Sequence, residues 1–200
     1  MLKVMVLDQT QEKLKEARYF IKKMVQTQKR PDEFRYNLDA FINSARSITW
    51  VLQKQNAKNP KFIGWYEKKR QEMQGDELLR FMVKARNVSV KEEVLNPDSL
   101  THIRHIYIEQ VPKGWSFVIT RRGEPVWVKY PNTQNEIRIH ANEYDEEVTI
   151  YYFFDKPKSP KTFFNTNIER FDVIRLCKLY LGYLEDIVKE AHTIIESASN

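Results

Sequence analysis

Arg86 and Asn87 are the residues whose types and spacing most suggest a reaction, and Lys91 follows them in the same segment. Acid–base catalysis needs one group that removes a proton from the attacking atom and another that protonates the leaving group. Lys91 stands beside Glu92 and Glu93, and we expect it to stay charged, which makes it a poor base. A charged lysine can still hold a phosphate as a point charge. The segment therefore favours phosphate contact over proton transfer.

Other chemistry-bearing motifs are absent from the sequence. Its five glycines form neither of the Gly-rich phosphate-binding patterns, and no Gly-x-Ser-x-Gly or His-Glu-x-x-His motif occurs. His102 and His105 are three positions apart on an expected strand, so they point to opposite faces and are poorly placed to share a metal. Cys177, the single cysteine, falls in an apolar helix stripe and is interpreted as a buried hydrophobe. We expect no metal and no cofactor.

Length and composition favour one soluble domain covering residues 1–200. No apolar run approaches the roughly 20 residues that cross a bilayer, so we expect no membrane contact and a cytoplasmic location. The charge is uneven, because residues 1–99 carry 20 Lys/Arg and 13 Asp/Glu, whereas residues 100–200 carry 13 and 14. A basic half is compatible with a polyanionic partner. It is also compatible with Lys and Arg that only form the solvent-exposed faces of helices.

The helical part is expected over residues 9–95. A first helix spans about residues 9–29, and Pro31 stops it while Asp32 is placed to cap the next one. The clearest stripe runs from Phe34 to Leu52 in steps of three and four, as an amphipathic helix requires. The opposite side of this helix is interpreted as a solvated face, made of Arg35, Asn43, Arg46, Gln53 and Lys54.

The next helical segments have clear start signals. Asn59 is placed to cap a helix with Pro60 at its first position, and Gly75-Asp76 is expected to kink or restart that helix. The continuation "DELLRFMVKAR" points its apolar residues inward and is expected to end at Arg86-Asn87. In that position Arg86 lies at the end of the buried stripe rather than out in solvent.

Five short runs over residues 100–155 have the composition of strands: "HIRHIYI", "WSFVIT", "VWVKY", "EIRIH" and "VTIYYFF". Loops of a few residues join them, which predicts an antiparallel five-stranded meander, since parallel pairs need long crossovers. The last run is apolar on both faces and is placed inside the sheet, against helices. A capping box from Thr166 to Glu169 then opens a long C-terminal helix over 166–197, expected to pack back on the bundle.

Residues 10–95 resemble the HEPN superfamily of small helical bundles. The resemblance rests on "FRYNLDAFINSARSITWVL", on "FIGWYEKKRQEMQGDELLRFMVKARN" and on its Arg-Asn ending. The family signature has a histidine four to six positions after the arginine, where this sequence has Val90, Lys91 and Glu92. The resemblance implies a helical bundle. Together with the strand-like runs it gives the expected fold class, α+β, with a HEPN-like bundle and the meander inserted before the last helix. The resemblance also implies a homodimer with facing motif residues, and either ribonuclease activity or a non-catalytic role.

The leading interpretation is a non-catalytic binding or assembly protein that contacts RNA or nucleotide through Lys84, Arg86 and Lys91. A divergent metal-independent ribonuclease, with Arg86, Asn87 and Lys91 as its candidate residues, is the first alternative. A structural subunit with a protein partner is the second. Arg86 could also serve only the fold, as a helix-end residue paired with Asp76 or Glu77, with Asn87 as the C-terminal residue of its helix.

Overall fold

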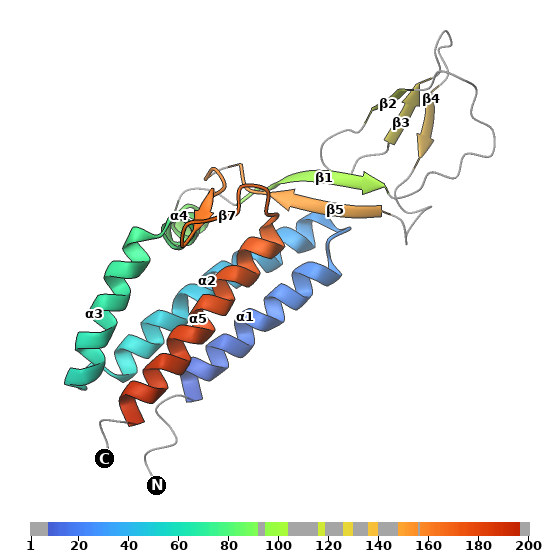
Figure 1. Cartoon of the computed structure of the whole chain (residues 1–200). Coiled ribbons are helices and arrows are strands. Elements are labelled where there is room, and N and C mark those ends of the chain that lie inside the picture. Colours follow the sequence, from blue (N-terminus) through green and yellow to red (C-terminus); the bar gives the residue numbers. More distant parts are fainter. Residues whose placement is uncertain are drawn as a thin grey trace.

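Five helices and seven short strands form the parts of the chain that the computed structural model describes, namely residues 8–91, 95–103, 116–118, 126–129, 136–139, 148–155 and 157–196. The helices are α1 (Asp8–Gln26), α2 (Pro31–Gln55), α3 (Pro60–Gly75), α4 (Glu77–Lys91) and α5 (Val173–Glu196). In Figure 1, α1, α2 and α5 run alongside one another and α3 stands at one edge. The prediction of a helical bundle is confirmed.

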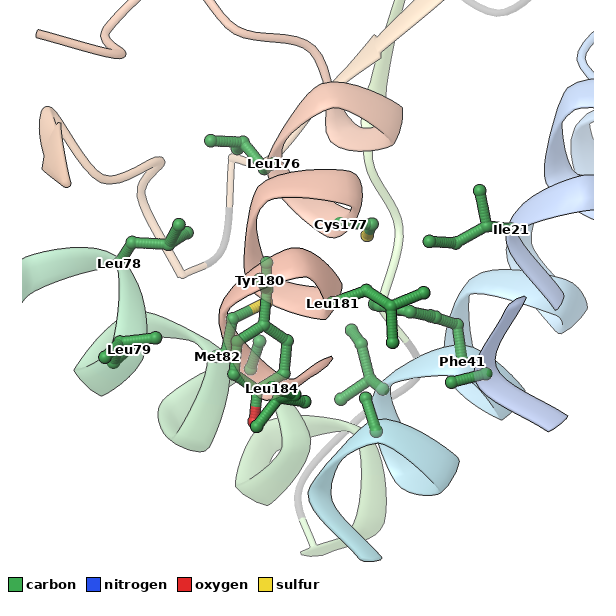
Figure 2. Close-up of a cluster of buried hydrophobic side chains, with 14 of the residues drawn as sticks. Ile21, Phe41, Leu78, Leu79, Met82, Leu176, Cys177, Tyr180, Leu181 and Leu184 are labelled. Carbon is green, nitrogen blue, oxygen red and sulfur yellow. The ribbon is translucent and has the colours of Figure 1, made fainter. Parts of the chain in front are cut away.

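The bundle is held by one apolar core to which all five helices contribute. The predicted stripe of α2 is buried from Phe34 to Leu52, and α5 is buried along the face that contains Cys177. Figure 2 shows Ile21 of α1 and Phe41 of α2 in the same cluster as the α5 side chains. Each fully buried Leu, Ile or Phe contributes about 1.5–3 kcal/mol, so this cluster is the main source of stability. Burial also raises the pKa of the Cys177 thiol, which confirms its interpretation as a hydrophobe.

Two of the predicted helix starts are confirmed by their caps. The Asn59 side chain accepts hydrogen bonds from the backbone of Lys61 and Phe62, with Pro60 in the first turn of α3. The helix restarts at Asp76, whose Oδ1 accepts a hydrogen bond from the Leu79 N–H at 2.9 Å. Both caps use a short polar side chain to satisfy N–H groups that have no partner within the helix.

The other two predicted starts are wrong. Pro31 lies in the first turn of α2 instead of ending α1, and the N-cap is Arg30, which makes no side-chain cap bond. Thr166 belongs to the short strand β7 (Thr166–Asn167), and α5 begins only at Val173. The cap of α5 is Asp172, whose Oδ1 accepts from the Arg175 N–H at 3.0 Å. Proline suits the first turn because it lacks the N–H that is unpaired there.

The predicted five-stranded meander is wrong, although four of the five runs contain a strand and the first run overlaps the end of another. These strands are β1 (Asp98–Ile103), β2 (Ser116–Val118), β3 (Val126–Lys129), β4 (Glu136–Ile139) and β5 (Val148–Phe153). β1 pairs antiparallel with β5, and β2, β3 and β4 form a separate three-stranded sheet. In Figure 1 that sheet lies beyond the far end of the β1–β5 ribbon, away from the helices.

The apolar character of β5 comes from helix contacts and not from a place inside a larger sheet. The Tyr152 ring stacks on Phe34 of α2 with centroids 3.8 Å apart, and its hydroxyl donates to the Gln28 carbonyl at 2.8 Å. Phe154, just after the strand, packs edge-on against Phe81 of α4. Burial against a helix and burial inside a sheet produce the same sequence pattern, so the pattern alone does not identify the strand neighbours.

A hairpin of β6 (Thr162–Phe163) and β7 is fastened to the start of α4. Its turn residues Phe164 and Asn165 have φ of 43° and 66°, in the left-handed region that a bulky side chain rarely adopts. The Phe164 N–H donates to Asp76 Oδ2 at 2.7 Å. Glu77 accepts from both the N–H and the hydroxyl of Thr162, at 3.0 and 2.8 Å. These bonds hold the turn in its strained conformation.

Candidate anion-binding groove

Arg86 and Asn87 lie inside α4 and not at its end. The helix continues to Lys91, so the interpretation of Asn87 as the C-terminal residue of its helix is wrong. Both side chains are half-buried, and Arg86 Nη1 donates to Asn87 Oδ1 over 3.5 Å, a long bond. The apolar stripe of α4 extends to the buried Val88, which explains why helical pairing persists beyond the expected end.

Arg86 faces a pocket between α4 and α2, here called the Trp50 pocket. Its volume is about 310 Å³, and its lining residues are Asn43, Arg46, Ser47, Trp50 and Arg86. Four of these residues come from α2 at spacings of three and four, so they share one face of that helix. The Trp50 indole is 65% exposed, which is unusual for so large an apolar group. The pocket therefore combines two guanidinium groups with an exposed aromatic ring.

The expected pairing of Arg86 with Asp76 or Glu77 does not occur. Both carboxylates bind the hairpin and the first turn of α4 instead. Within the described ranges Arg86 and Arg46 form no ion pair with any carboxylate. Arg46 Nη1 donates to the Thr49 hydroxyl at 2.6 Å. The positive charge of this face is thus not neutralised by the residues that the structure describes around it.

A second pocket opens on the other side of Arg46 and is here called the Tyr180 pocket. Its volume is about 400 Å³, and it is lined by residues of α2, α3, α4 and α5: Arg46, Thr49, Gln53, Tyr66, Arg70, Met73, Gln74, Leu79, Arg80, Val83 and Tyr180. Arg46 lines both pockets. Both hollows border this side chain, and they are here together called the groove.

The electrostatics of the groove follow from which groups line it. Neither lining set contains Asp, Glu or His among the residues described. Burial raises the pKa of Tyr66, against a hydrogen bond with Thr49 and the charges of Arg46 and Arg70, and it raises the pKa of Tyr180 to about 12. Both phenols are therefore neutral at pH 7, and the groove is cationic throughout.

The other predicted phosphate contacts lie elsewhere on α4. Lys84 and Lys91 are exposed, and neither lines either pocket. Lys84 precedes Arg86 by two residues, which is roughly 200° around a helix, so these two side chains point in nearly opposite directions. The structure therefore brings Arg86 together with Arg46 rather than with the two lysines.

The sequence predicts Asn43, Arg46 and Gln53 on a solvated helix face, whereas in the structure all three line the pockets, and Trp50 lies beside them. The available signal was Trp50 itself, a large aromatic residue on the polar side of α2 with Arg46 one turn before it. Membership of the pocket also depends on α4 packing beside α2, which spacing along one helix does not reveal. No group of three His, Cys, Asp or Glu side chains placed to hold a metal occurs in the described ranges.

Comparison with known proteins gives one family. A family model described as bacteriophage lambda protein ea47 matches residues 5–115. This segment includes every residue of the Trp50 pocket and, of the Tyr180 pocket, all but Tyr180. No curated protein and no solved structure matches the chain. None of the helices described has both the length and the apolar composition needed to cross a membrane.

Proposed function

The chain belongs to the family of bacteriophage lambda protein ea47, and we propose that it is a non-catalytic, HEPN-like binding protein whose ligand is single-stranded RNA. The observation that carries this proposal is the Trp50 pocket. There an exposed indole stands beside Arg46 and Arg86, and neither arginine has a carboxylate partner among the described residues. A stacking surface beside phosphate-binding groups is what a single strand requires.

Trp50 supplies the stacking surface. An unpaired base can lie on an exposed aromatic ring, and each such contact contributes about 1–3 kcal/mol, whereas the bases of a duplex are already stacked on each other. Lys54, one turn further along α2, holds its ammonium 6.0 Å from the centre of the Trp50 ring. A lysine at that distance is placed to meet the phosphate that follows a stacked base.

Arg46 and Arg86 supply the phosphate contacts. A guanidinium presents several N–H donors in a fixed plane and can bind two phosphate oxygens at once. Ser47 donates its hydroxyl proton to the Asn43 backbone carbonyl, and Asn43 Nδ2 donates one N–H to the Asp39 backbone carbonyl. The second amide N–H of Asn43 is therefore the neutral donor left for a ligand in this pocket. None of these groups can distinguish one base from another through its phosphate, so we expect little sequence preference.

The pocket is better suited to binding than to cleavage. Its lining is asparagine, serine, tryptophan and two arginines, none of which exchanges a proton near neutral pH. Transfer of a proton from the 2′-hydroxyl and to the leaving oxygen requires such groups. We therefore expect no cleavage of RNA in EDTA beyond that of an Arg86→Ala variant. Robust cleavage that this substitution removes would replace the binding proposal with the ribonuclease alternative.

The binding test is a fluorescence-anisotropy titration of a labelled single-stranded RNA and of the matching duplex, from 0.05 to 0.2 M salt. We expect the single strand to bind more tightly, and Arg46→Gln with Arg86→Gln to weaken it at least tenfold. The magnitude of the slope of log K against log salt should decrease by about 1.4, since each lost phosphate contact to a single strand removes about 0.7. Arg170→Gln with Arg175→Gln makes the same charge change on an exposed part of the chain and should leave the slope unchanged.

The competing use of this face is a homodimer interface. Its exposed apolar side chains are Tyr36, Trp50, Val83 and Val90, all on α2 or α4. Light scattering at tens of micromolar, with and without RNA, separates the two uses. A dimer that Trp50→Ala dissociates and RNA leaves intact would assign the face to a second copy. A monomer that retains RNA binding would assign it to RNA.

A further inference from the structure

We infer that the Tyr180 pocket binds a small organic phosphate, with its phosphate on Arg46, Arg70 and Arg80 and its apolar body against the side chains of the opposite wall. This inference goes beyond RNA contact at the Trp50 pocket. It depends on the proposed function only through Arg46, which lines both hollows. Its own evidence is an unpaired hydroxyl, the convergence of three arginines and the size and character of the walls.

The Tyr180 hydroxyl has no hydrogen-bond partner among the residues described, although the side chain is only 6% exposed. Figure 2 shows Tyr180 extending from α5 among Leu79 and Met82 of α4 and Leu184 of α5. Among the described side chains the fully buried polar atom without a partner is Arg35 Nε, so the unpaired Tyr180 hydroxyl is one that opens onto the pocket. A phenol is protonated at neutral pH, and burial raises the pKa of Tyr180 further, to about 12, so its hydroxyl is available to donate into the pocket. A ligand oxygen would satisfy it.

Three arginines reach the pocket from three different helices: Arg46 from α2, Arg70 from α3 and Arg80 from α4. Arg70 pairs with Glu67 at 2.8 Å on the exposed rim. Arg80 forms no direct ion pair among the described residues, although its charge helps to lower the pKa of Glu77. Arg46 and Arg80 have no direct carboxylate partner among the described residues, so an anion between them would reduce their mutual repulsion. Donors from three directions match the oxygen shell of a dianionic phosphate better than the single plane of a carboxylate.

The remaining walls suit the organic part of the ligand. Met73, Leu79 and Val83 form an apolar side, and the amides of Gln53 and Gln74 can donate and accept hydrogen bonds. The volume of about 400 Å³ lies in the range of roughly 300–1,000 Å³ typical of small-molecule pockets. Inorganic phosphate would leave this apolar wall uncovered, so a phosphate ester with a flat or apolar body should bind more tightly.

The test is isothermal titration of the full chain with three probes: inorganic phosphate, phenyl phosphate and adenosine monophosphate. We expect at least one ester to bind tenfold or more tightly than inorganic phosphate. Binding of both esters indicates a general organic-phosphate pocket, and binding of adenosine monophosphate alone indicates that nucleoside phosphates are the source. No saturable binding of either ester at millimolar concentration, or equal affinity for phosphate and the esters, would overturn the inference.

Variants connect the binding to the pocket. We expect Arg80→Gln to weaken ester binding at least tenfold. Tyr180→Phe should weaken it severalfold and leave the urea midpoint nearly unchanged, because no hydrogen bond to a described residue is lost. Arg170→Gln is the charge-matched control. Ester binding that survives both pocket variants would contradict the inference.

The two proposals fail separately. Trp50→Leu should weaken RNA binding and leave ester binding intact, since Trp50 does not line the Tyr180 pocket. Loss of ester binding in that variant would contradict a separate site. If RNA fails to bind while an ester binds, the RNA proposal fails and the phosphate inference stands.

Discussion

Two regions of the bundle surface both carry Lys or Arg side chains, but only in one of them are these cations paired with carboxylates of another helix among the described residues. On the side where α1 and α3 meet α5, cations are paired across helices: Arg18 with Glu185 at 2.7 Å, and Lys69 with Glu190 at 3.1 Å. On the side where α4 meets α2, Arg46, Arg80 and Arg86 have no such partner within the described residues. Because the first set is neutralised within the molecule, its role is structural. The second set is available to an external anion.

The carboxylates nearest to the arginine face are engaged elsewhere. Asp76 and Glu77 both hold the β6–β7 hairpin on the start of α4. As a result α4 is fixed at its first turn by acids and presents arginines further along. This separation of charge along a single helix distinguishes the groove from an ordinary solvated surface, where both signs are interspersed.

The largest effect is expected from Asp76→Ala. The substitution removes the cap of α4 and the acceptor of the Phe164 N–H, both at a buried side chain, and should lower the free energy of unfolding by about 2–3 kcal/mol. Urea denaturation followed by circular dichroism measures it. The control is Asp186→Ala, whose 68%-exposed carboxylate pairs with Lys189 and should contribute less than about 0.5 kcal/mol. Equal losses would remove the distinction between fixed and solvated carboxylates.

A smaller effect is expected from the pH dependence of Glu77. The Thr162 hydroxyl bond is the main reason that the pKa of Glu77 is lowered from its ordinary value of 4.5. A lowered pKa in the folded state means that the stabilisation is present above the unfolded pKa and is lost as pH falls through the folded pKa. The difference in urea midpoint between the native chain and Glu77→Gln should therefore shrink from pH 6 to pH 3. A difference that stays constant over this range would contradict a contribution from the ionised carboxylate.

The smallest effect is expected where the arginines themselves are removed. Arg46→Gln with Arg86→Gln should change the free energy of unfolding by less than about 1 kcal/mol, since the hydrogen bond from Arg46 to Thr49 is lost but no ion pair is. Arg18→Gln with Lys69→Gln removes two inter-helix pairs and should cost up to about 1 kcal/mol for each. Thermal unfolding of both double variants tests the contrast. A greater loss from the groove pair would show that its arginines support the fold.

Features written into local sequence could be predicted, and those set by distant contacts could not. The α2 stripe and the Asn59 cap depend on residues within a few positions of each other, so spacing and side-chain type were sufficient. The partner of β5 is β1, some fifty residues earlier, and the short loops between the intervening strands suggested sequential pairing instead. Thr166–Glu169 matched a capping pattern, yet Asp172 caps the helix.

The residues of the candidate site also differ in whether local sequence is enough to predict them. Arg86 was located because it stands in a recognisable segment with Asn87, whereas Arg46 resembled any other cation on a polar helix face. Only the packing of α4 beside α2 reveals that the two arginines share a pocket. The lysines at 84 and 91 were grouped with Arg86 by proximity in sequence, although the turn of the helix separates them.

The β1–β5 ribbon makes the chain tolerant of engineering at one place. Ile103 and Val148 are neighbours in the antiparallel register, so the path that leaves the helices at one strand returns beside it at the other. A two-residue Asn-Gly turn is the natural connection between such neighbours. Replacing residues 104–147 by that turn, or by a foreign module with adjacent ends, would keep α5 attached at the same point in space. We therefore expect that the segment between β1 and β5 can be replaced without any change to the helical bundle.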